Sequence, residues 1–145
     1  GHSTFDFYNY WMHQRGTTAF PGLFYGNKFI NSPAVGIDTD IWTCVEVQIT
    51  LNDPVSGFSG EIAMWINGIE VARIKQGTTG TWTEDRFQPG TVGAPFEGFQ
   101  WRNDANLNVN YFQILHFVDR DADGQVNSVN YDHVVLARKY IGPIK

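Results

Sequence analysis

The chain has 145 residues, a length that fits one domain at residues 1–145 with a hydrophobic core of its own. A formal charge of −5 and ten scattered Lys and Arg residues exclude a nucleic-acid partner, because phosphate binding requires clustered cations. The only cysteine, Cys44, excludes an internal disulfide, and no apolar run is long enough to cross a membrane. Aromatic residues make up 15% of the chain and charged residues 17%, which is typical of an all-β fold.

Period-two alternation of apolar and polar residues recurs along the first half of the chain. The chain begins at Gly1 and reaches a strand-like run at once, which leaves open whether N-terminal strands of the domain are missing. Residues 4–14 carry aromatic side chains on both faces, which predicts a central strand with one face in the core and one lining a cleft. A short strand is expected at residues 23–25. Residues 42–51 give the clearest alternation, with Val45, Val47, Ile49 and Leu51 as the apolar face.

Asn67-Gly68 separates two alternating runs, residues 61–66 and 69–74. This dipeptide predicts a β-hairpin, because both central residues of a type I′ turn need a positive φ. The apolar alternation assigns one set to the core face: Ile62, Met64, Ile66, Ile69 and Val71. It assigns a second set to the opposite face: Ala63, Trp65, Glu70 and Ala72.

The second half of the chain begins with a long loop region, residues 76–99, in which a short strand is expected near Trp82. Residues 109–118 are expected to form another strand, and residues 131–140 a closing strand. About eight strands at this spacing, with no helical pattern between them, predict a two-sheet antiparallel β-sandwich or jelly roll.

An acidic loop follows the predicted strand at residues 109–118. Asp119, Asp121 and Asp123 occupy its positions 1, 3 and 5, and Gly124 at position 6 permits a sharp turn. Three alternating carboxylates repel one another without a counter-ion, so the loop predicts a Ca²⁺ site. The remaining candidate ligands follow at short intervals: Gln125, Asn127, Asn130 and Asp132. Because Asn130 stands where a bidentate Glu is usual, Asp132 or a residue from a distant loop is expected to complete the site, which braces the edge of the sandwich.

Residues 119–140 also resemble half of a dockerin module, through the run DGQVNS at residues 123–128. A dockerin requires two such loops and this chain has one, so the resemblance is limited to the metal geometry. The alternative interpretation of the acidic residues is a solvated surface turn.

Three segments resemble a known family: FDFYNYW at residues 5–11, WTCVE through GEIAMWING at residues 42–68, and YDHVVLA through YIGP at residues 131–143. They are similar to the concanavalin A-like (LamG-like) jelly rolls of bacterial secreted proteins, grouped with the family-14 and family-20 polysaccharide lyases. The resemblance implies two antiparallel sheets, a concave face that accepts a polysaccharide, an extracellular location and a structural calcium ion.

Three functions remain open, and the first is non-catalytic binding of a polysaccharide by this jelly roll. Exposed aromatic rings stack on the apolar faces of sugars, and polar side chains bond the hydroxyl groups. The candidate ligand-binding residues are Trp65, Trp82, Trp101, Glu46, Gln48 and Gln113. The alternation that turns Trp65 away from the core is the strongest of these arguments.

The second function is β-elimination on a uronic acid polymer, which needs a general acid, a base and a group that neutralises the carboxylate. The candidate catalytic residues are Tyr8, Tyr10, His13, Gln14 and His116, with Gln113 as a further neutralising group. Hydrolysis is less favoured, because Glu46 is followed by Gln48 rather than by a second carboxylate on the same face, and a pair with Glu61 is weak.

The third function is a structural or adhesion module of a cell-surface protein. The sequence does not decide whether the chain is an enzyme, and it leaves the oligomeric state open.

Overall fold

The computed structural model describes residues 2–31, 35–115, 124 and 126–143, and these residues form no helix. None of them belongs to a helix of the length and apolar character that a membrane crossing needs. The chain divides into two compact units, one of Gly1–Asn108 with Ile141–Lys145 and one of Val109–Tyr140. All ten strands found in the described part of the chain belong to the first unit.

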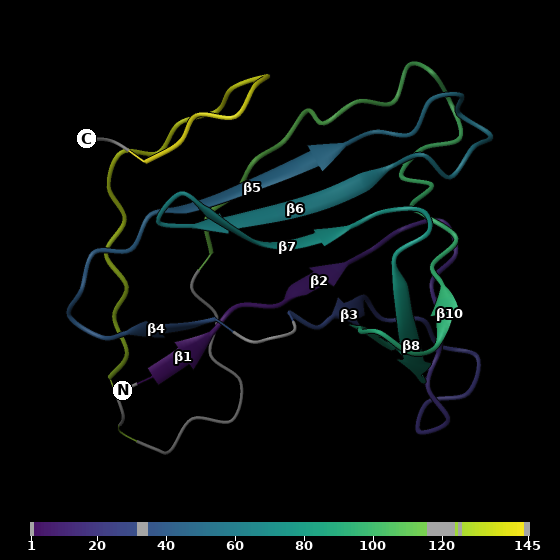
Figure 1. Cartoon of the computed structure of the whole chain (residues 1–145), viewed down its shortest axis with the longest axis horizontal. Helices are drawn as coiled ribbons and strands as arrows, with labels where there is room; N and C mark the ends of the chain where they lie inside the picture. The colour runs from purple at the N-terminus through teal and green to yellow at the C-terminus, as the bar shows by residue number, and fades with distance from the viewer. Residues whose placement is uncertain (1, 32–34, 116–123, 125, 144–145) are drawn as a thin grey trace. The chain divides into compact units, whose positions relative to one another are not determined.

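The first unit contains two antiparallel sheets of few strands, visible in Figure 1. The two-stranded sheet pairs β1 (His2–Thr4) with β4 (Gly36–Asp38). The three-stranded sheet has the order β5-β6-β7, which follow one another directly in the sequence. Its strands are Val45–Thr50 (β5), Glu61–Ile66 (β6) and Ile69–Ile74 (β7).

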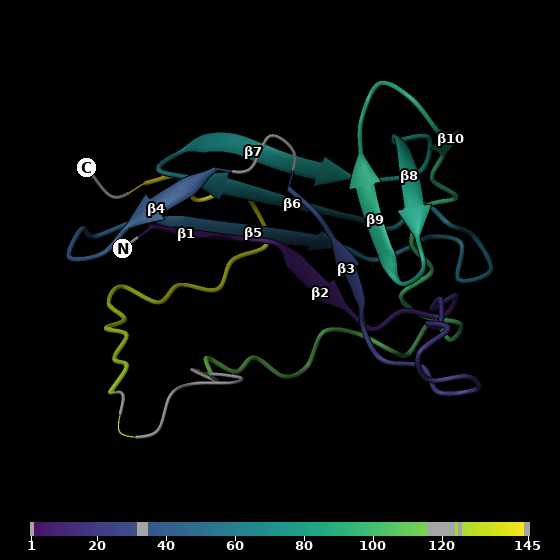
Figure 2. The ribbon, with the colours of Figure 1, turned by 90° about the horizontal axis from the view of Figure 1, so that it is seen from below.

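The five-stranded sheet has the order β10-β8-β9-β3-β2 and so joins the start of the unit to its later part. All neighbours in it are antiparallel except β3 and β9, which run parallel and lie side by side in Figure 2. Its strands are Phe7–Asn9 (β2), Asn27–Phe29 (β3), Thr79–Thr83 (β8), Arg86–Pro89 (β9) and Ala94–Pro95 (β10).

The β6–β7 hairpin confirms the predicted turn and strand boundaries. Ala72, expected on the face opposite the core, instead packs against the core, because an irregularity between Met64 and Trp65 shifts the register and places Ala72 opposite Met64. Asn67 and Gly68 both have positive φ, 49° and 80°, as a type I′ turn requires. The Asn67 side chain also accepts a hydrogen bond from the Cys44 N–H at 3.0 Å, and its own N–H donates to the Cys44 carbonyl at 2.8 Å. The turn therefore holds the start of β5 beside the end of β6.

A single aromatic-rich core lies between the five-stranded and the three-stranded sheets. The five-stranded sheet and its connecting loops supply Phe7, Trp11, Phe29, Phe87, Phe96 and Phe99, and the three-stranded sheet supplies Ile62, Met64, Ile66 and Ile74. The ring centroids of Phe29 and Phe99 are 4.8 Å apart, and those of Trp11 and Phe99 are 5.4 Å apart. Two sheets that share one core are compatible with the predicted β-sandwich.

The predicted long strand at residues 4–14 is wrong in extent, although its alternation is confirmed. Phe7 and Trp11 point into the core while Tyr8 and Tyr10 are exposed, but β-pairing ends at Asn9. The chain then bends, because the buried Asn27 side chain binds the Trp11 indole N–H at 2.9 Å and the backbone of Arg15. The strand expected at residues 23–25 is also wrong, since β3 begins at Asn27.

Some apolar faces are more exposed than the pattern predicts. Ile69 was expected in the core but has 69% of its surface exposed, because it lies next to the hairpin turn. Val45, Val47 and Ile49 of β5 are also exposed, since β5 is the edge of its sheet and extends beyond the core.

The strands expected at residues 109–118 and 131–140 are not present in their described parts, 109–115 and 131–140. A run of alternating residues becomes a strand only where a neighbour supplies ladder hydrogen bonds, and these residues have no strand partner in the described structure. Tyr111, Leu115 and Leu136 are accordingly more than 60% exposed.

Candidate functional site

The outer face of the five-stranded sheet carries charged, hydroxyl and aromatic side chains. Tyr8 of β2 lies opposite Lys28 of β3, and Lys28 lies opposite Arg86 of β9. Arg86 in turn faces Thr83 of β8 across the antiparallel pair. Their sequence neighbours, among them Phe29 and Phe87, are fully buried on the inner face, so the alternation of each strand presents this row to solvent.

A hollow of about 360 Å³ adjoins this face, between the loop that precedes β3 and the turn that joins β8 to β9. We call it the aromatic hollow. Its lining residues are Thr17, Ala19, Phe20, Tyr25, Thr83, Glu84, Asp85 and Arg86. In Figure 1 the loop lies at the lower right, beside the end of β8. Because Thr83 and Arg86 belong both to the hollow and to the sheet face, the two form one continuous surface.

Two aromatic rings form the wall of the aromatic hollow on the loop side. The Phe20 and Tyr25 centroids are 5.6 Å apart with an interplanar angle of 77°, an edge-to-face arrangement. Both side chains are about half exposed, at 53% and 46%. The polar turn Thr83–Arg86 lines the same hollow, so aromatic surface and hydrogen-bonding groups border one cavity.

Tyr8 is fixed against the same loop. Its ring packs so closely on Gly26 that a Cβ at position 26 would lie 2.5 Å from the Tyr8 Cε1 atom. Partial burial and a hydrogen bond with Tyr10 raise the pKa of the Tyr8 hydroxyl above its usual value, and the Asp85 charge raises this pKa further. Tyr8 is therefore a protonated hydrogen-bond donor at neutral pH.

Charges of both signs surround the aromatic hollow. Two hydrogen bonds from Thr18 lower the pKa of Glu84, so this carboxylate is ionised at neutral pH. Within the described ranges, no ion pair engages the side chain of Lys28 or Arg86. The site thus offers two cations without an ion-pair partner in the described part of the chain, two carboxylates, hydroxyl groups and exposed rings, which together suit a polyhydroxylated ligand.

Trp65, the strongest candidate from the sequence, lies on the outer face of the other sheet. The register places Glu46 opposite Trp65 on the neighbouring strand and Gln48 opposite Ala63, so three predicted ligand-binding residues share this face. Trp65 is absent from the core cluster, which confirms the alternation. The expectation that its ring is available is wrong, however, because only 9% of the residue is exposed.

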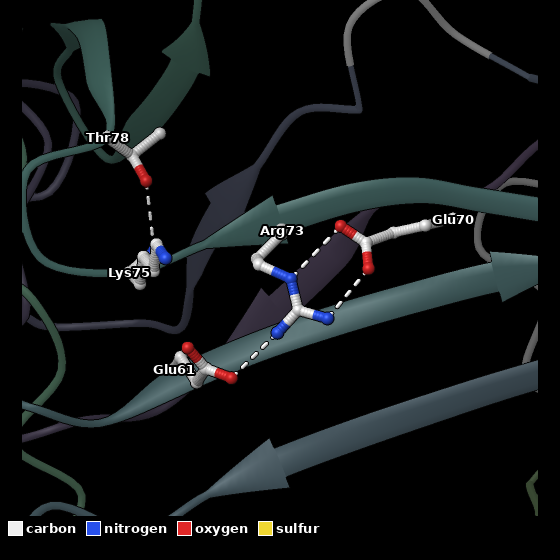
Figure 3. A network of polar contacts seen from close by, with 5 residues as sticks. All are labelled: Glu61, Glu70, Arg73, Lys75 and Thr78. Atoms are coloured by element: carbon white, nitrogen blue, oxygen red, sulfur yellow. Dashed lines mark hydrogen bonds and ion pairs between the residues drawn. The ribbon is translucent and has the colours of Figure 1, made fainter. Parts of the chain in front are cut away.

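The Trp65 ring is covered by Arg73, which two ion pairs hold in place. Arg73 lies over the ring, with its guanidinium carbon 5.4 Å from the centroid, and binds Glu70 and Glu61 at 2.7 Å each (Figure 3). Glu46 accepts hydrogen bonds from the backbone N–H groups of Ile141 and Gly142, at 2.8 and 3.0 Å. The charged groups around Trp65 are thus engaged within the protein, whereas Gln48 is exposed at the same face.

The other two predicted tryptophans are partly buried against the core. Trp82 packs its ring against Phe29 and Phe87, and the Arg15 guanidinium lies 4.3 Å over it. Trp101 stacks on Phe99 with centroids 4.2 Å apart and an interplanar angle of 11°. Neither ring lines the aromatic hollow.

The predicted catalytic residues do not form one group. Tyr8 and Tyr10 are neighbours, with ring centroids 5.7 Å apart. His13 instead contacts Phe58 and Glu97, its Nδ1 atom lying 3.3 Å from the Glu97 carboxylate. The Gln14 amide nitrogen is buried and has no hydrogen-bond partner among the described residues. Gln113 is exposed in the second unit, and His116 lies outside the described residues.

Most of the predicted calcium loop, namely Asp119, Asp121, Asp123 and Gln125, also lies outside the described residues. Gly124 has a φ of 83°, the conformation that the sequence interpretation requires of it. Asn127 and Asn130 are exposed, and the Asp132 carboxylate accepts a hydrogen bond from the His133 N–H at 2.7 Å. Within the described ranges, no three His, Cys, Asp or Glu residues gather as a metal site would need.

Sequence reasoning missed Phe20, Tyr25, Lys28 and Arg86. The available signal was the stretch around Pro21-Gly22, where three aromatic residues, Phe20, Phe24 and Tyr25, occur beside turn formers. Strand propensity does not explain aromatic residues in a segment without strand alternation, so their presence there indicates a binding role.

Comparisons with protein-family models, with curated proteins and with solved structures find no match for this chain. A functional conclusion therefore rests on the chemistry of the site itself.

Proposed function

We propose that the chain is a carbohydrate-binding domain of a secreted, polysaccharide-active protein, and that the aromatic hollow receives the sugar. The observation that carries this proposal is the pair of half-exposed rings, Phe20 and Tyr25, facing the polar turn of β8 and β9. Ring faces stack on the C–H faces of pyranoses, while hydroxyl, carboxylate and guanidinium groups bond their hydroxyls.

The proposed architecture is a concanavalin A-like jelly roll. Two sheets around one aromatic core support it, as does the resemblance of residues 5–11, 42–68 and 131–143 to the lyase-associated jelly rolls. A location outside the cell is part of the same proposal, since the polysaccharides of cell walls and extracellular matrices occur there.

Affinity gel electrophoresis through laminarin, xylan, alginate and pectate tests the proposal. We expect one or more of these polysaccharides to retard the protein, and Tyr25→Ala to weaken retardation about tenfold, since stacking on one aromatic ring is worth roughly 1–3 kcal/mol. Phe24→Ala is the matched control, because Phe24 is adjacent and 60% exposed but does not line the hollow. Equal loss in both variants, or no retardation of the wild type, contradicts the proposal.

The second candidate function is β-elimination on a polyuronate. Tyr8 favours it, because the raised pKa keeps its hydroxyl protonated at neutral pH, as a proton donor must be. Tyr8 also lies opposite Lys28, and Arg86 follows on the next strand, so two cations of this face are placed to neutralise a carboxylate. The expected result is an unsaturated, ultraviolet-absorbing product from alginate or pectate that Tyr8→Phe abolishes. If the protein binds the polysaccharide and no such product appears, the result favours the non-catalytic binding function.

We further propose that residues 119–132 hold a structural Ca²⁺ ion, supported by the alternating aspartates and by the left-handed Gly124. The melting temperature should rise with the logarithm of free calcium, equivalent to about 2.7 kcal/mol at a hundredfold excess over Kd. Asp121→Ala should remove the response, whereas Asp104→Ala, outside the loop, should keep it. If the melting temperature of the wild type does not change with calcium concentration, the proposed calcium site is contradicted. Calcium stabilisation without glycan retention would instead favour a structural or adhesion module.

A further inference from the structure

Glu84 occupies an unusual position in the turn between β8 and β9. It is the first of the two residues between Thr83 and Arg86, and its φ is 53°. This left-handed conformation is costly for a residue with a Cβ atom, and Gly, Asn or Asp are the usual choices there. Glu84 is therefore held in place by something other than its own backbone preference.

The contact that holds it is with the loop on the other side of the aromatic hollow. The Glu84 carboxylate accepts hydrogen bonds from both the backbone N–H of Thr18, at 3.2 Å, and the Thr18 hydroxyl. Across the described ranges, these are the hydrogen bonds that join residues 16–25 to the β8–β9 turn. They lie one residue from Thr17 and two from Phe20, both of which line the hollow.

We propose that Glu84 is a positioning residue, which holds the loop of residues 16–25 so that Phe20 and Tyr25 face Arg86 across the aromatic hollow. This inference rests on the proposed carbohydrate-binding function and adds the residue that presets its geometry. Holding a binding loop in its bound arrangement lowers the ordering cost of association, so the contact raises affinity without touching the sugar.

The pH dependence of this contact has a defined sign. The hydrogen bonds from Thr18 lower the pKa of Glu84, so the carboxylate is more stable ionised in the folded protein than in the unfolded chain. The stabilisation is complete above the unfolded pKa and disappears as the pH falls through the lowered folded pKa. Arg86 contributes to the same lowering through its charge.

Hydrogen exchange measured by mass spectrometry tests the positioning role directly. In Glu84→Gly we expect protection factors of residues 16–25 to fall about tenfold or more, while those of the β6–β7 hairpin stay unchanged. Glycine accepts the left-handed φ, so the global unfolding midpoint should stay the same or rise. Thr18→Val removes the hydroxyl bond and keeps the backbone one, so it should give a smaller local loss. Thr18→Ser, which keeps both bonds, should preserve protection.

Glu84→Gln removes the negative charge and keeps the size of the side chain and an acceptor oxygen. The backbone strain at position 84 is also unchanged, so this variant isolates the effect of the charge. Its loop protection should not change with pH across the range in which that of the wild type declines. Retardation by the polysaccharide that binds the wild type best, among laminarin, xylan, alginate and pectate, should weaken about tenfold in Glu84→Gly and remain in Thr18→Ser.

Unchanged protection of residues 16–25 in Glu84→Gly overturns the positioning role, whatever the protein binds. Lost protection with full retardation overturns it as well, because the loop position would then not govern affinity. If none of the four polysaccharides retards the wild type, the binding function fails, and exchange alone decides whether Glu84 positions the loop.

Discussion

The two sheets present outer faces of similar composition and opposite accessibility. The three-stranded sheet places Trp65 among Glu46, Glu61, Glu70 and Arg73, and the five-stranded sheet places Tyr8 beside Lys28 and Arg86. On the first face Arg73 pairs with Glu61 and Glu70, Glu46 binds backbone N–H groups, and the ring is covered. On the second face the cations have no ion-pair partner within the described ranges and half of the Tyr8 surface is exposed.

The difference shows that alternation determines which way a side chain points, whereas its neighbours determine whether it can be reached. Trp65 points outward and is nonetheless buried, because a bidentate arginine lies over its ring. We therefore expect the face around Trp65 to contribute mainly to stability and the aromatic hollow mainly to recognition.

The largest expected effect comes from Trp65→Ala. Removing a large buried ring leaves a cavity and should lower the free energy of unfolding by about 3 kcal/mol or more. Urea denaturation measures this loss, and Trp42→Ala, at a residue 71% exposed, should change stability by less than about 0.5 kcal/mol. If the folded Trp65→Ala protein loses polysaccharide retention while Tyr25→Ala keeps it, the assignment of the two faces is reversed.

The turn of the three-stranded sheet should be sensitive to a change at its left-handed glycine. Gly68→Ala in the three-stranded sheet should destabilise the protein by about 1–2 kcal/mol, because alanine at a φ of 80° is strained. Gly90→Ala is the control, since a Cβ there meets no atom within 4 Å. Thermal unfolding distinguishes them, and an equal effect of both substitutions would show that the turn conformation is unimportant.

The smallest expected effect belongs to the ion pairs around Trp65. Hydrogen bonding to Arg73 lowers the pKa of Glu70, so its contribution is present above the unfolded pKa and is lost as the pH falls through the folded one. Glu70→Gln should cost about 0.5 kcal/mol near neutral pH, a value typical of partly exposed pairs, and nothing in acid. A double-mutant cycle with Arg73→Ala measures the coupling, and a pH-independent cost would exclude an electrostatic origin.

The sequence predicts local features of this fold well and long-range ones poorly. The hairpin at Asn67-Gly68 is confirmed because its signal is contained in two residues and the alternation beside them. The strands expected at residues 109–118 and 131–140 depend on distant partners, which no local pattern encodes. The same limit applies to the site, because the aromatic hollow joins residues 17–25 to residues 83–86 across about sixty positions of chain.

The parallel pairing of β3 with β9 has a consequence for the order in which the chain folds. All of β5, β6 and β7 lie between these two strands in the sequence, and each of the three pairs with its immediate neighbour. The three-stranded sheet therefore forms by closing only short loops. Pairing of β3 with β9 instead requires closure of a long loop, which costs more conformational entropy and is slower. We expect early protection in the β6–β7 hairpin during refolding and late protection at Lys28 and Phe29. The surface that we propose to bind polysaccharide would then be the last part of the unit to form.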